Sequence, residues 1–536
     1  MAELVKEYRA LNGAINTGVT SELLKATEVR GLVNVDISEI GKLTKSNGTD
    51  LFADLSAVTE SVSGPKFIFG TNRNDLIYAY SQDNLMWNYD GTWANIHTDP
   101  LNVSKGYVWL LDTLFMVDED DGSIHSYNLD VDEFLDGRHL INVPTDVDAI
   151  GQVNGKMYVA SGNKIYESSA PRQIVTTVID THVAGSTTIH VDSTRYLQAG
   201  NTVEVHPADN DTARESVQVV AVTSDTTFTC TAITNQFENG DELFYENLYG
   251  IDTIMWDTDT VKGNFFLSDD NCVALQGHKG TMLVFSDNGS IERYSGSRND
   301  NISANTGTFV PLTITAIGDK VYFFETESDR LMVVDGNNVY EVGKKAKAYW
   351  DVATMSAAFS TGFGGKYRVY IGSVDIDDET YDHGQIIFDP STDTFSFEDT
   401  IHVSAYGIFD SQLLLGDETS DNIHVIDKET HLLDDGTTEL EMNYVIKTKH
   451  DDLDKPDIYK YFTKAWFYCE PGTILDVSYS IDRGEVKHLG QITQQVQSFE
   501  INDRGNTISY IISESSKGEV PGFKGFKTKA AYDDEE

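Results

Sequence analysis

The sequence predicts an all-β protein with a β-propeller-like body, a small inserted β-domain and a C-terminal β-sandwich. Residues 274–342 hold two rounds of one pattern, in which an apolar strand, a polar turn and a second strand ending in an aromatic residue follow one another. Turn clusters at 286–289 and 335–338 separate short runs rich in Val, Ile, Phe and Tyr, as in antiparallel hairpins. One short hairpin cannot bury its own apolar face, so its repetition predicts stacked copies.

The same hairpin pattern recurs along most of the chain, in units that would each supply one propeller blade, for which about 30 to 45 residues is usual. Seven such units are found, at residues 67–93, 107–131, 150–169, twice within 274–342, 366–399 and 405–430. Two stacked β-sandwiches would also repeat hairpins, without a central axis. The constant order of strand, turn and aromatic residue favours the propeller.

Changes in this pattern divide the chain into domains. The predicted boundaries are an N-terminal segment or arm, 1–60; the first part of the propeller, 61–170; an inserted small β-barrel or sandwich, 171–248; the second part of the propeller, 249–436; a C-terminal β-sandwich, 437–530; and an acidic tail, 531–536.

The N-terminal segment differs from the blades. Residues 21–29 predict a short helix capped by Ser21, and Leu32–Ile37 alternates as a strand does. We expect this segment to lay a strand against the body and to leave an arm free to reach a neighbouring molecule.

Two further regions also depart from the blade pattern. The inserted region is rich in Thr and Val and alternates strictly at 188–191 and 202–205, which predicts five or six short strands. After about Gly436 the strands become longer, as in a sandwich, and a turn falls at Gly484.

Charge is the strongest compositional signal. The 536 residues include 39 Lys and Arg against 86 Asp and Glu, a formal net charge of −47. Residues 437–536 hold 18 acidic and 12 basic side chains, so about −41 belongs to the residues before them. Such a surface argues against a broad phosphate-neutralising nucleic-acid footprint. With 40% apolar residues the chain still has material for packed cores.

Cysteine usage and hydropathy set further limits. Cys230, Cys272 and Cys469 lie far apart without CxxC spacing, so buried free thiols are expected rather than disulfides or structural zinc. The first residues lack a basic region followed by an apolar one, and no run of about 18 apolar residues occurs. We therefore expect no signal peptide and no membrane span.

Motifs for chemistry are scarce. The acidic turns 118–122 and 375–379 alternate oxygen ligands as calcium loops do, but their glycine and distal glutamate are misplaced, so solvated turns are favoured. The 13 histidines show no HExxH or HxH spacing, and GxSxG, P-loop and strand-to-helix GxGxxG motifs are absent. A carboxylate pair for glycoside cleavage could still come from different blades. Trp87 and Trp109 lie in strand runs and are expected in blade cores rather than in sugar platforms. We assign no catalytic, cofactor-binding or metal-binding residue, and expect no enzyme.

Three stretches carry a resemblance to a known family. They are residues 27–45; residues 185–205 with 216–222; and the closing segments 447–449, 461–467 and 477–482. In this order they resemble the tail nozzle or tail hub proteins of short-tailed bacteriophages, also called packaged-DNA stabilisation proteins. None of these motifs is diagnostic alone, and the family has no catalytic residues to carry over.

The resemblance implies a structural virion protein assembled in the host cytoplasm. It would form a ring, usually a homo-hexamer, below the portal and adaptor proteins, and would hold tail fibres or other tail proteins outside. Double-stranded viral DNA would pass through without specific binding, and an acidic wall would lower friction by repulsion. The alternatives are a receptor-binding or baseplate-associated propeller, and a propeller glycosidase or polysaccharide lyase.

Overall fold

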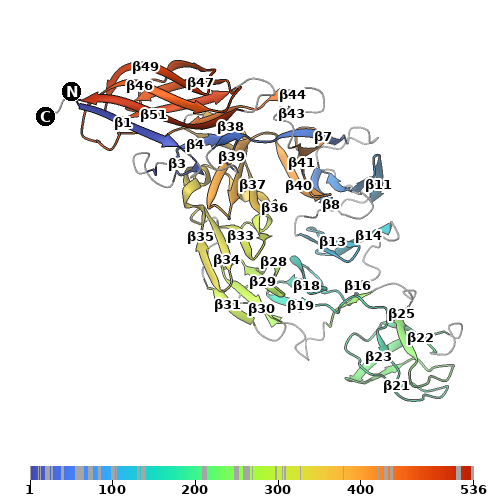
Figure 1. The fold of residues 1–536 in the computed structure, drawn as a ribbon. Coiled ribbons are helices and arrows are strands. Elements are labelled where there is room, and N and C mark those ends of the chain that lie inside the picture. The colour runs from blue at the N-terminus through green and yellow to red at the C-terminus, as the bar shows by residue number, and fades with distance from the viewer. Residues whose placement is uncertain are drawn as a thin grey trace. The chain divides into compact units, whose positions relative to one another are not determined.

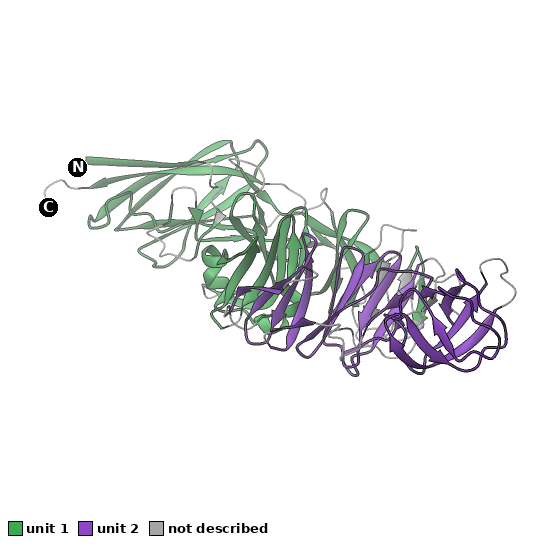
Figure 2. Ribbon diagram, turned by 90° about the horizontal axis from the view of Figure 1, so that it is seen from below, with its two compact units in different colours: residues 1–100, 308–536 green, residues 101–307 purple. Residues whose placement is uncertain are grey.

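The computed structural model describes residues 2–532 with gaps, and strands dominate it (Figure 1). Outside the described residues lie 1, 10, 12–13, 18–23, 26–27, 38–41, 55–64, 71–76, 82–85, 98–102, 104–105, 130–132, 135–139, 208–213, 247–252, 258–265, 269, 296–298, 305, 307–308, 326, 378, 421, 428–431, 435–438, 515–520 and 533–536. The chain divides into two compact units, residues 1–100 with 308–536, and residues 101–307 (Figure 2).

Seven antiparallel sheets have the strand order expected of propeller blades, counted over the described residues, with four in the first unit and three in the second. Those of the first unit are β8 (Pro65–Gly70), β9 (Ile77–Ser81), β10 (Met86–Tyr89) and β11 (Trp93–His97); β32 (Thr315–Ile317), β33 (Lys320–Glu325), β34 (Arg330–Asp335) and β35 (Asn338–Glu341); β36 (Phe359–Phe363), β37 (Lys366–Ile376), β38 (Glu379–Asp389) and β39 (Thr394–Asp399); and β40 (Val403–Phe409), β41 (Gln412–Asp417) and β42 (Asn422–Asp427), which continue into β7 (Gly48–Asp54), β43 (Leu432–Asp434) and β44 (Glu439–Glu441).

The second unit holds the other three blade sheets. They are β12 (Tyr107–Leu110), β13 (Thr113–Val117), β14 (Ile124–Asn128) and β15 (Glu133–Phe134); β17 (Ala149–Val153), β18 (Lys156–Ser161), β19 (Lys164–Glu167) and β27 (Phe266–Leu267); and β28 (Cys272–His278), β29 (Thr281–Ser286), β30 (Ile291–Tyr294) and β31 (Asn299–Ser303). Inner strands such as β13 and β29 are buried almost throughout, as expected for sheets covered on both faces. The predicted all-β, propeller-like fold class is confirmed.

Glycines stand where the first strands of neighbouring blades meet. A Cβ atom on Gly70 of β8 would lie 1.7 Å from the carbonyl oxygen of Ile408 in β40. One on Gly407 of β40 would lie 2.3 Å from Cγ2 of Ile68. Within the second unit, β17 and β28 approach in the same way through Gly151 and Gly277. These strands can come so close because at each contact one strand carries a glycine, whose missing side chain leaves room for the backbone or the side chain of the other strand.

The last blade of the first unit takes its fourth strand from the N-terminal part of the chain. Strand β7 pairs antiparallel with β42, from Gly48 opposite Asp427 to Asp54 opposite Asn422. Ala53 of β7 is buried in the apolar cluster of this blade. The N-terminal segment thus lays a strand against a blade, but this strand is β7 and not the predicted 32–37, and it covers an edge that would otherwise be open.

A separate six-stranded sheet interrupts the third blade of the chain. Its strands are β20 (Thr176–Thr177), β25 (Glu242–Tyr245), β22 (Thr202–His206), β23 (Glu215–Ser224), β24 (Thr227–Cys230) and β21 (Thr188–His190), in that order. It has its own apolar core, which includes Val203 and Phe228. The parallel pair β16 (Leu140–Ile141) and β26 (Ile254–Met255) lies in the chain before and after it. The blade's fourth strand, β27, follows the insertion, so the inserted domain falls within this blade rather than after it.

The C-terminal sandwich consists of two sheets. One contains β49 (Val496–Gly505), β46 (Lys460–Cys469), β51 (Gly522–Tyr532), β6 (Leu43–Lys45), β5 (Val35–Asp36) and β1 (Ala2–Arg9); the other contains β4 (Gly31–Val33), β45 (Tyr444–Lys447), β50 (Ile508–Glu514), β47 (Leu475–Ile481) and β48 (Lys487–Ile492). Alternate residues of β46 and β47 are buried, because one face of each sheet meets the shared core.

The N-terminal segment corrects two expectations. Within the predicted helix 21–29, Glu28–Val29 forms strand β3, which pairs parallel with β2 (Ala14–Ile15), while 21–23 and 26–27 lie outside the described residues. The arm expected to be free also pairs within its own chain, since β1 runs along β51 from Ala2 opposite Tyr532 to Arg9 opposite Gly525 (Figure 1). Both changes follow from tertiary pairing, which overrides local propensity.

Asn34 divides the strand predicted over 32–37 into two strands of different sheets. Its φ angle is +53°, and its side chain is almost fully buried. Its amide nitrogen donates to the carbonyl oxygens of Asp399 (3.1 Å) and Asn443 (2.8 Å), and its side-chain oxygen accepts from the Asp399 N–H (2.8 Å). The chain thus crosses from one sheet of the sandwich to the other at a corner tied to the blade that ends in β39.

A buried ion pair joins the N-terminal segment to the sandwich. The Lys45 Nζ lies 3.0 Å from Oε2 of Glu514, and the two side chains are 0% and 2% exposed. Removing one charge from such a pair leaves the other buried and uncompensated.

We predict that Gly70→Ala destabilises the protein by about 1–3 kcal/mol, because its Cβ would overlap the backbone of the next blade. Gly31→Ala is the matched control, since a Cβ there would meet Lys447 at an ordinary 3.6 Å. Urea denaturation measures both variants. Equal stability of the two would contradict glycine-dependent blade packing.

For the ion pair, Glu514→Leu alone is expected to lower the free energy of unfolding by about 3–5 kcal/mol. The double variant Lys45→Met with Glu514→Leu should recover most of that loss, because no buried charge remains. A double-mutant cycle in guanidinium chloride checks this. If the two losses were simply additive, the pair would not be coupled.

Candidate functional site

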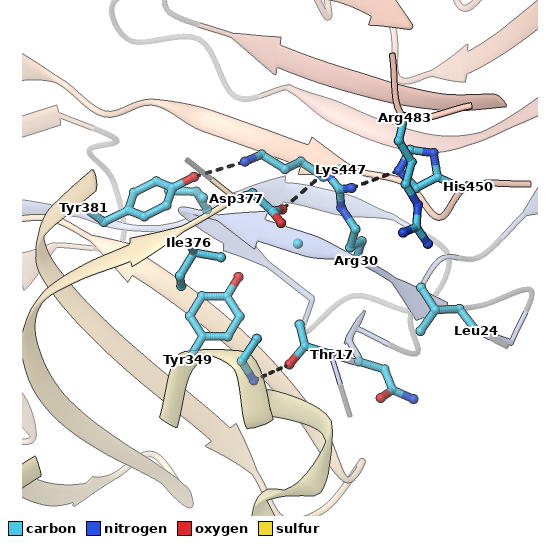
Figure 3. A pocket seen from close by; sticks show the side chains of 14 residues that line it. Thr17, Leu24, Arg30, Tyr349, Ile376, Asp377, Tyr381, Lys447, His450 and Arg483 are labelled. Carbon is cyan, nitrogen blue, oxygen red and sulfur yellow. Dashed lines mark hydrogen bonds and ion pairs between the residues drawn. The ribbon is translucent and has the colours of Figure 1, made fainter. Parts of the chain in front are cut away.

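A cavity of about 340 Å³ lies within the first unit, where the N-terminal segment, one blade and the sandwich meet (Figure 3). It is lined by Asn16, Thr17, Leu24, Arg30, Gly31, Val33, Ala348, Tyr349, Ile376, Asp377, Tyr381, Lys447, His450 and Arg483. Its size falls in the range of small-molecule pockets. Four of the lining side chains are Arg, Lys or His, in a chain that is strongly acidic overall.

The pairing of β4 with β45 brings basic side chains together at the cavity. Gly31 of β4 is opposite Lys447 of β45, so Arg30, just before β4, stands beside the end of β45. The Arg30 guanidinium donates through Nη1 to Nε2 of His450 at 3.0 Å, and its Nη2 lies 3.2 Å from a carboxylate oxygen of Asp377. Because arginine only donates, Nε2 of His450 must accept here, which places the imidazole proton of a neutral ring on Nδ1.

Lys447 forms the second link between the sandwich and the blade. Its side chain is only 6% exposed, and Nζ donates to Oε2 of Glu379 at 2.7 Å and to the Tyr381 hydroxyl at 3.4 Å. Burial opposes ionisation of Glu379, but hydrogen bonds from Lys447 and Tyr381 outweigh it and lower the pKa of this carboxyl. Burial, together with the Glu379 carboxylate, raises the pKa of Tyr381.

A short helix closes another side of the cavity. Helix α1 (Lys347–Trp350) contributes Ala348 and Tyr349, and the Ala348 N–H donates to Oγ1 of Thr17 at 2.9 Å. Tyr349 is buried, which raises the pKa of its hydroxyl. The cavity wall therefore joins segments that lie more than 300 residues apart in the sequence.

Arg483 reaches the cavity from a strained turn. Residues Ile481–Gly484 form a turn closed by the Gly484 N–H and the Ile481 carbonyl oxygen at 2.8 Å. The central residues Asp482 and Arg483 have φ angles of +50° and +60°, as in a type I′ turn. The second central position of such turns favours glycine, so an arginine there carries a conformational cost.

A second candidate site is the outer face of one sandwich sheet, which we call the Trp466 face. The strand registers bring together Arg9, Tyr461, Lys464, Trp466, Tyr468, Arg504, Lys527 and Lys529. Nζ of Lys464 and Nζ of Lys527 lie 5.5 and 5.4 Å from the Trp466 ring centroid. Arg504 and Arg9 lie 5.4 and 5.0 Å from the rings of Tyr461 and Tyr468.

This face carries an excess of positive charge. Its five cations share the surface with three carboxylates, because Glu3, Glu7 and Glu500 pair with Lys529, Arg9 and Lys464 at 2.7, 2.6 and 3.0 Å. Cation–π contacts hold the lysine and arginine side chains over the rings. Tryptophan, tyrosine and arginine are the side chains that dominate protein–protein contacts.

The sequence pointed elsewhere for possible ligand positions. In the turn 118–122, Oδ1 of Asp118 accepts the N–H of Asp120 at 2.8 Å, so this carboxylate closes its own turn. In 375–379, Oδ1 of Asp375 accepts from Thr380, and 378 lies outside the described residues. Over the residues that the structure describes, no group of three His, Cys, Asp or Glu side chains could hold a metal ion.

Other sequence expectations concern cysteines and tryptophans. The three cysteines are free and buried, as predicted, and burial raises the pKa of the Cys230 thiol to about 11. Trp109 lies half-buried in β12, and the side chain of Trp87 is outside the described part of the chain. Within that part, no helix is long and apolar enough to cross a membrane.

Sequence reasoning missed both candidate sites. The cavity draws on residues from 16 to 483, which no local pattern connects. The Trp466 face did leave a signal, since Lys464, Trp466 and Tyr468 occupy alternate positions of one strand beside the lysine-rich β51. Alternation of basic and aromatic residues on a strand's outer face would have identified it.

Several solved structures match this chain at low sequence identity. No protein-family model matches the sequence, and the search of curated proteins found no match. The WD40 domain of Neurospora crassa Pan2 shares 9% identity at a TM-score of 0.35, covering 71% of this chain and 94% of that domain. The WD40 repeats of RRP9 share 6% identity at 0.33, covering 70% and 99%. The computationally designed Ika8 protein shares 10% identity at 0.34, covering 69% and 98%.

We predict that Glu379→Gln destabilises the protein by about 1 kcal/mol at pH 7, because half-exposed pairs contribute little beyond that. The folded-state pKa of Glu379 lies below its usual 4.5, so the carboxylate stabilises the fold above pH 4.5 and loses this effect as the pH falls through the lowered pKa. The difference from the wild type should therefore shrink in acid. Thermal unfolding from pH 7 to pH 3 measures it, with Glu500→Gln as a more exposed control. A difference independent of pH would contradict the role of the carboxylate charge.

Proposed function

We propose that this chain is a structural protein of a short-tailed bacteriophage tail, assembling in the host cytoplasm into an oligomeric nozzle or hub ring of the virion. The resemblance of residues 27–45, of 185–205 with 216–222, and of the closing segments 447–449, 461–467 and 477–482 to such proteins supports this function. So does the order of an N-terminal segment, a propeller-like body with an inserted β-domain, and a closing sandwich. On this proposal the chain is not an enzyme, and its function lies in the assembled ring.

The observation that carries the proposal is the separation of charge within the chain. The net charge of −47 lies mostly before residue 437, whereas the Trp466 face of the sandwich is basic and aromatic. A wall with such an excess of carboxylates repels a polyanion and lets double-stranded DNA pass without specific binding. The same charge makes copies of the chain repel one another, so assembly needs contacts of opposite sign.

The Trp466 face fits such a contact. In a ring each copy meets the next through two different surfaces. The contact between these two surfaces is repeated around the axis. A basic, aromatic face on one copy and a carboxylate-rich surface on its neighbour satisfy that requirement. Aromatic rings supply buried area, and the lysines supply charge complementarity. The portal, the adaptor and the tail fibres would bind other surfaces of the ring.

Negative-stain electron microscopy of the purified full chain tests the proposal. We expect rings with an open axial hole, most simply of six copies. Lys527→Glu should shift the population toward monomers, because it reverses one charge beside Trp466 and adds to the repulsion. Trp466→Ala should act in the same direction through lost contact area.

Lys320→Glu is the matched control for this experiment. Lys320 also lies over a tyrosine ring, at 6.0 Å from Tyr340, but it stands on a blade strand away from the sandwich. Its reversal should leave the rings intact. A wild-type chain that stays monomeric at every salt concentration, or rings that survive Lys527→Glu and Trp466→Ala unchanged, would overturn the proposed assembly.

A further inference from the structure

The cavity of Figure 3 has a charge opposite to that of the chain as a whole. Three basic side chains, Arg30, Lys447 and Arg483, line it together with one carboxylate, Asp377. Glu379, which does not line the cavity, forms an ion pair with Lys447 at 2.7 Å and offsets part of its charge. In a protein with 86 acidic and 39 basic residues, a lining with more basic side chains than carboxylates suits an anion.

Arg30 is held in position but not saturated. Nη1 donates to His450 and Nη2 pairs with Asp377, whereas its buried Nε donates no hydrogen bond to any described group. A buried donor without an acceptor is costly, and the cavity beside it is polar enough to supply one. Arginine is suited to oxyanions because its donors match their geometry.

Arg483 supplies the second indication. The turn sequence Asp482-Arg483 adopts positive φ angles at both positions, where Asp-Gly would be relaxed. Asp482 is stabilised there by the backbone N–H groups of Asn506 and Thr507, at 2.8 and 2.7 Å, but Arg483 has no such conformational advantage. Strained backbone is enriched at functional sites, so the conformational cost at Arg483 is consistent with a role of its side chain in binding.

We propose that this cavity binds a small phosphate-bearing anion, held between the guanidinium groups of Arg30 and Arg483 and the ammonium group of Lys447. The hydroxyl group of Tyr349 lines the same space and supplies a further donor. The anion would join the N-terminal segment, the β37–β38 hairpin and the sandwich, because each contributes to the lining.

Isothermal titration calorimetry of the full chain with inorganic phosphate, at pH 7 and constant ionic strength, tests this binding. We expect saturable binding with a Kd of about 1 mM or tighter. Arg483→Gly should weaken it at least tenfold while leaving the unfolding temperature equal or higher, since glycine relaxes the turn. Asp377→Asn should tighten it several-fold, since it removes the lining carboxylate at a position, φ +53°, that asparagine tolerates.

Arg504→Gln is the matched control, because it removes one positive charge on the Trp466 face and not in the cavity. Its phosphate affinity should equal that of the wild type. Absence of saturable binding to the wild type would overturn the proposal. So would equal losses in Arg483→Gly and Arg504→Gln, which would indicate nonspecific screening. The measurement does not require ring formation, so its failure is distinguishable from failure of the proposed assembly.

Discussion

The pairing of β7 with β42 is the constraint on which the first unit depends. Without β7 the last blade would expose an unpaired strand edge, and such edges promote aggregation. The same N-terminal segment contributes β1, β4, β5 and β6 to the sandwich before it reaches the blade. Between these strands, the hydrogen bonds of Asn34 and the Lys45–Glu514 ion pair fix the N-terminal segment to the blade and to the sandwich. The strand that completes the blade is therefore also part of the framework that carries the cavity and the Trp466 face.

Charge gives this framework its functional character. The excess of carboxylates keeps the chain soluble and repels polyanions, but it also opposes self-association. The few clustered cations attract negatively charged groups most strongly where they are partly buried, because salt screens partly buried charges least. Lys447 and Arg30 meet this condition in the cavity, and Lys464 and Lys527 meet it over Trp466. The proposed contact and the proposed anion site both follow from this distribution.

Much of the fold could be read from the sequence because its signals are local. Turn clusters such as Ser286–Gly289 and the alternation in 202–205 depend on period-two burial and on turn geometry, which neighbouring residues determine. The helix expected over 21–29 was wrong at Glu28–Val29 because pairing with β2 competes with a weak helical tendency. The free arm was wrong for a similar reason, since β51 offers β1 a full edge.

The sequence by itself determined the all-β class, the repeated blades, the inserted domain, the closing sandwich and the acidic balance. Only the tertiary structure decided that β7 completes the last blade, that the insertion splits a blade, and that Arg30, Lys447 and Arg483 share one cavity. Hairpins form between neighbours in the sequence, so their residues carry a local pattern. The cavity and the pairing of β7 with β42 join residues hundreds of positions apart in the sequence. Only the packing of distant strands brings these residues into contact.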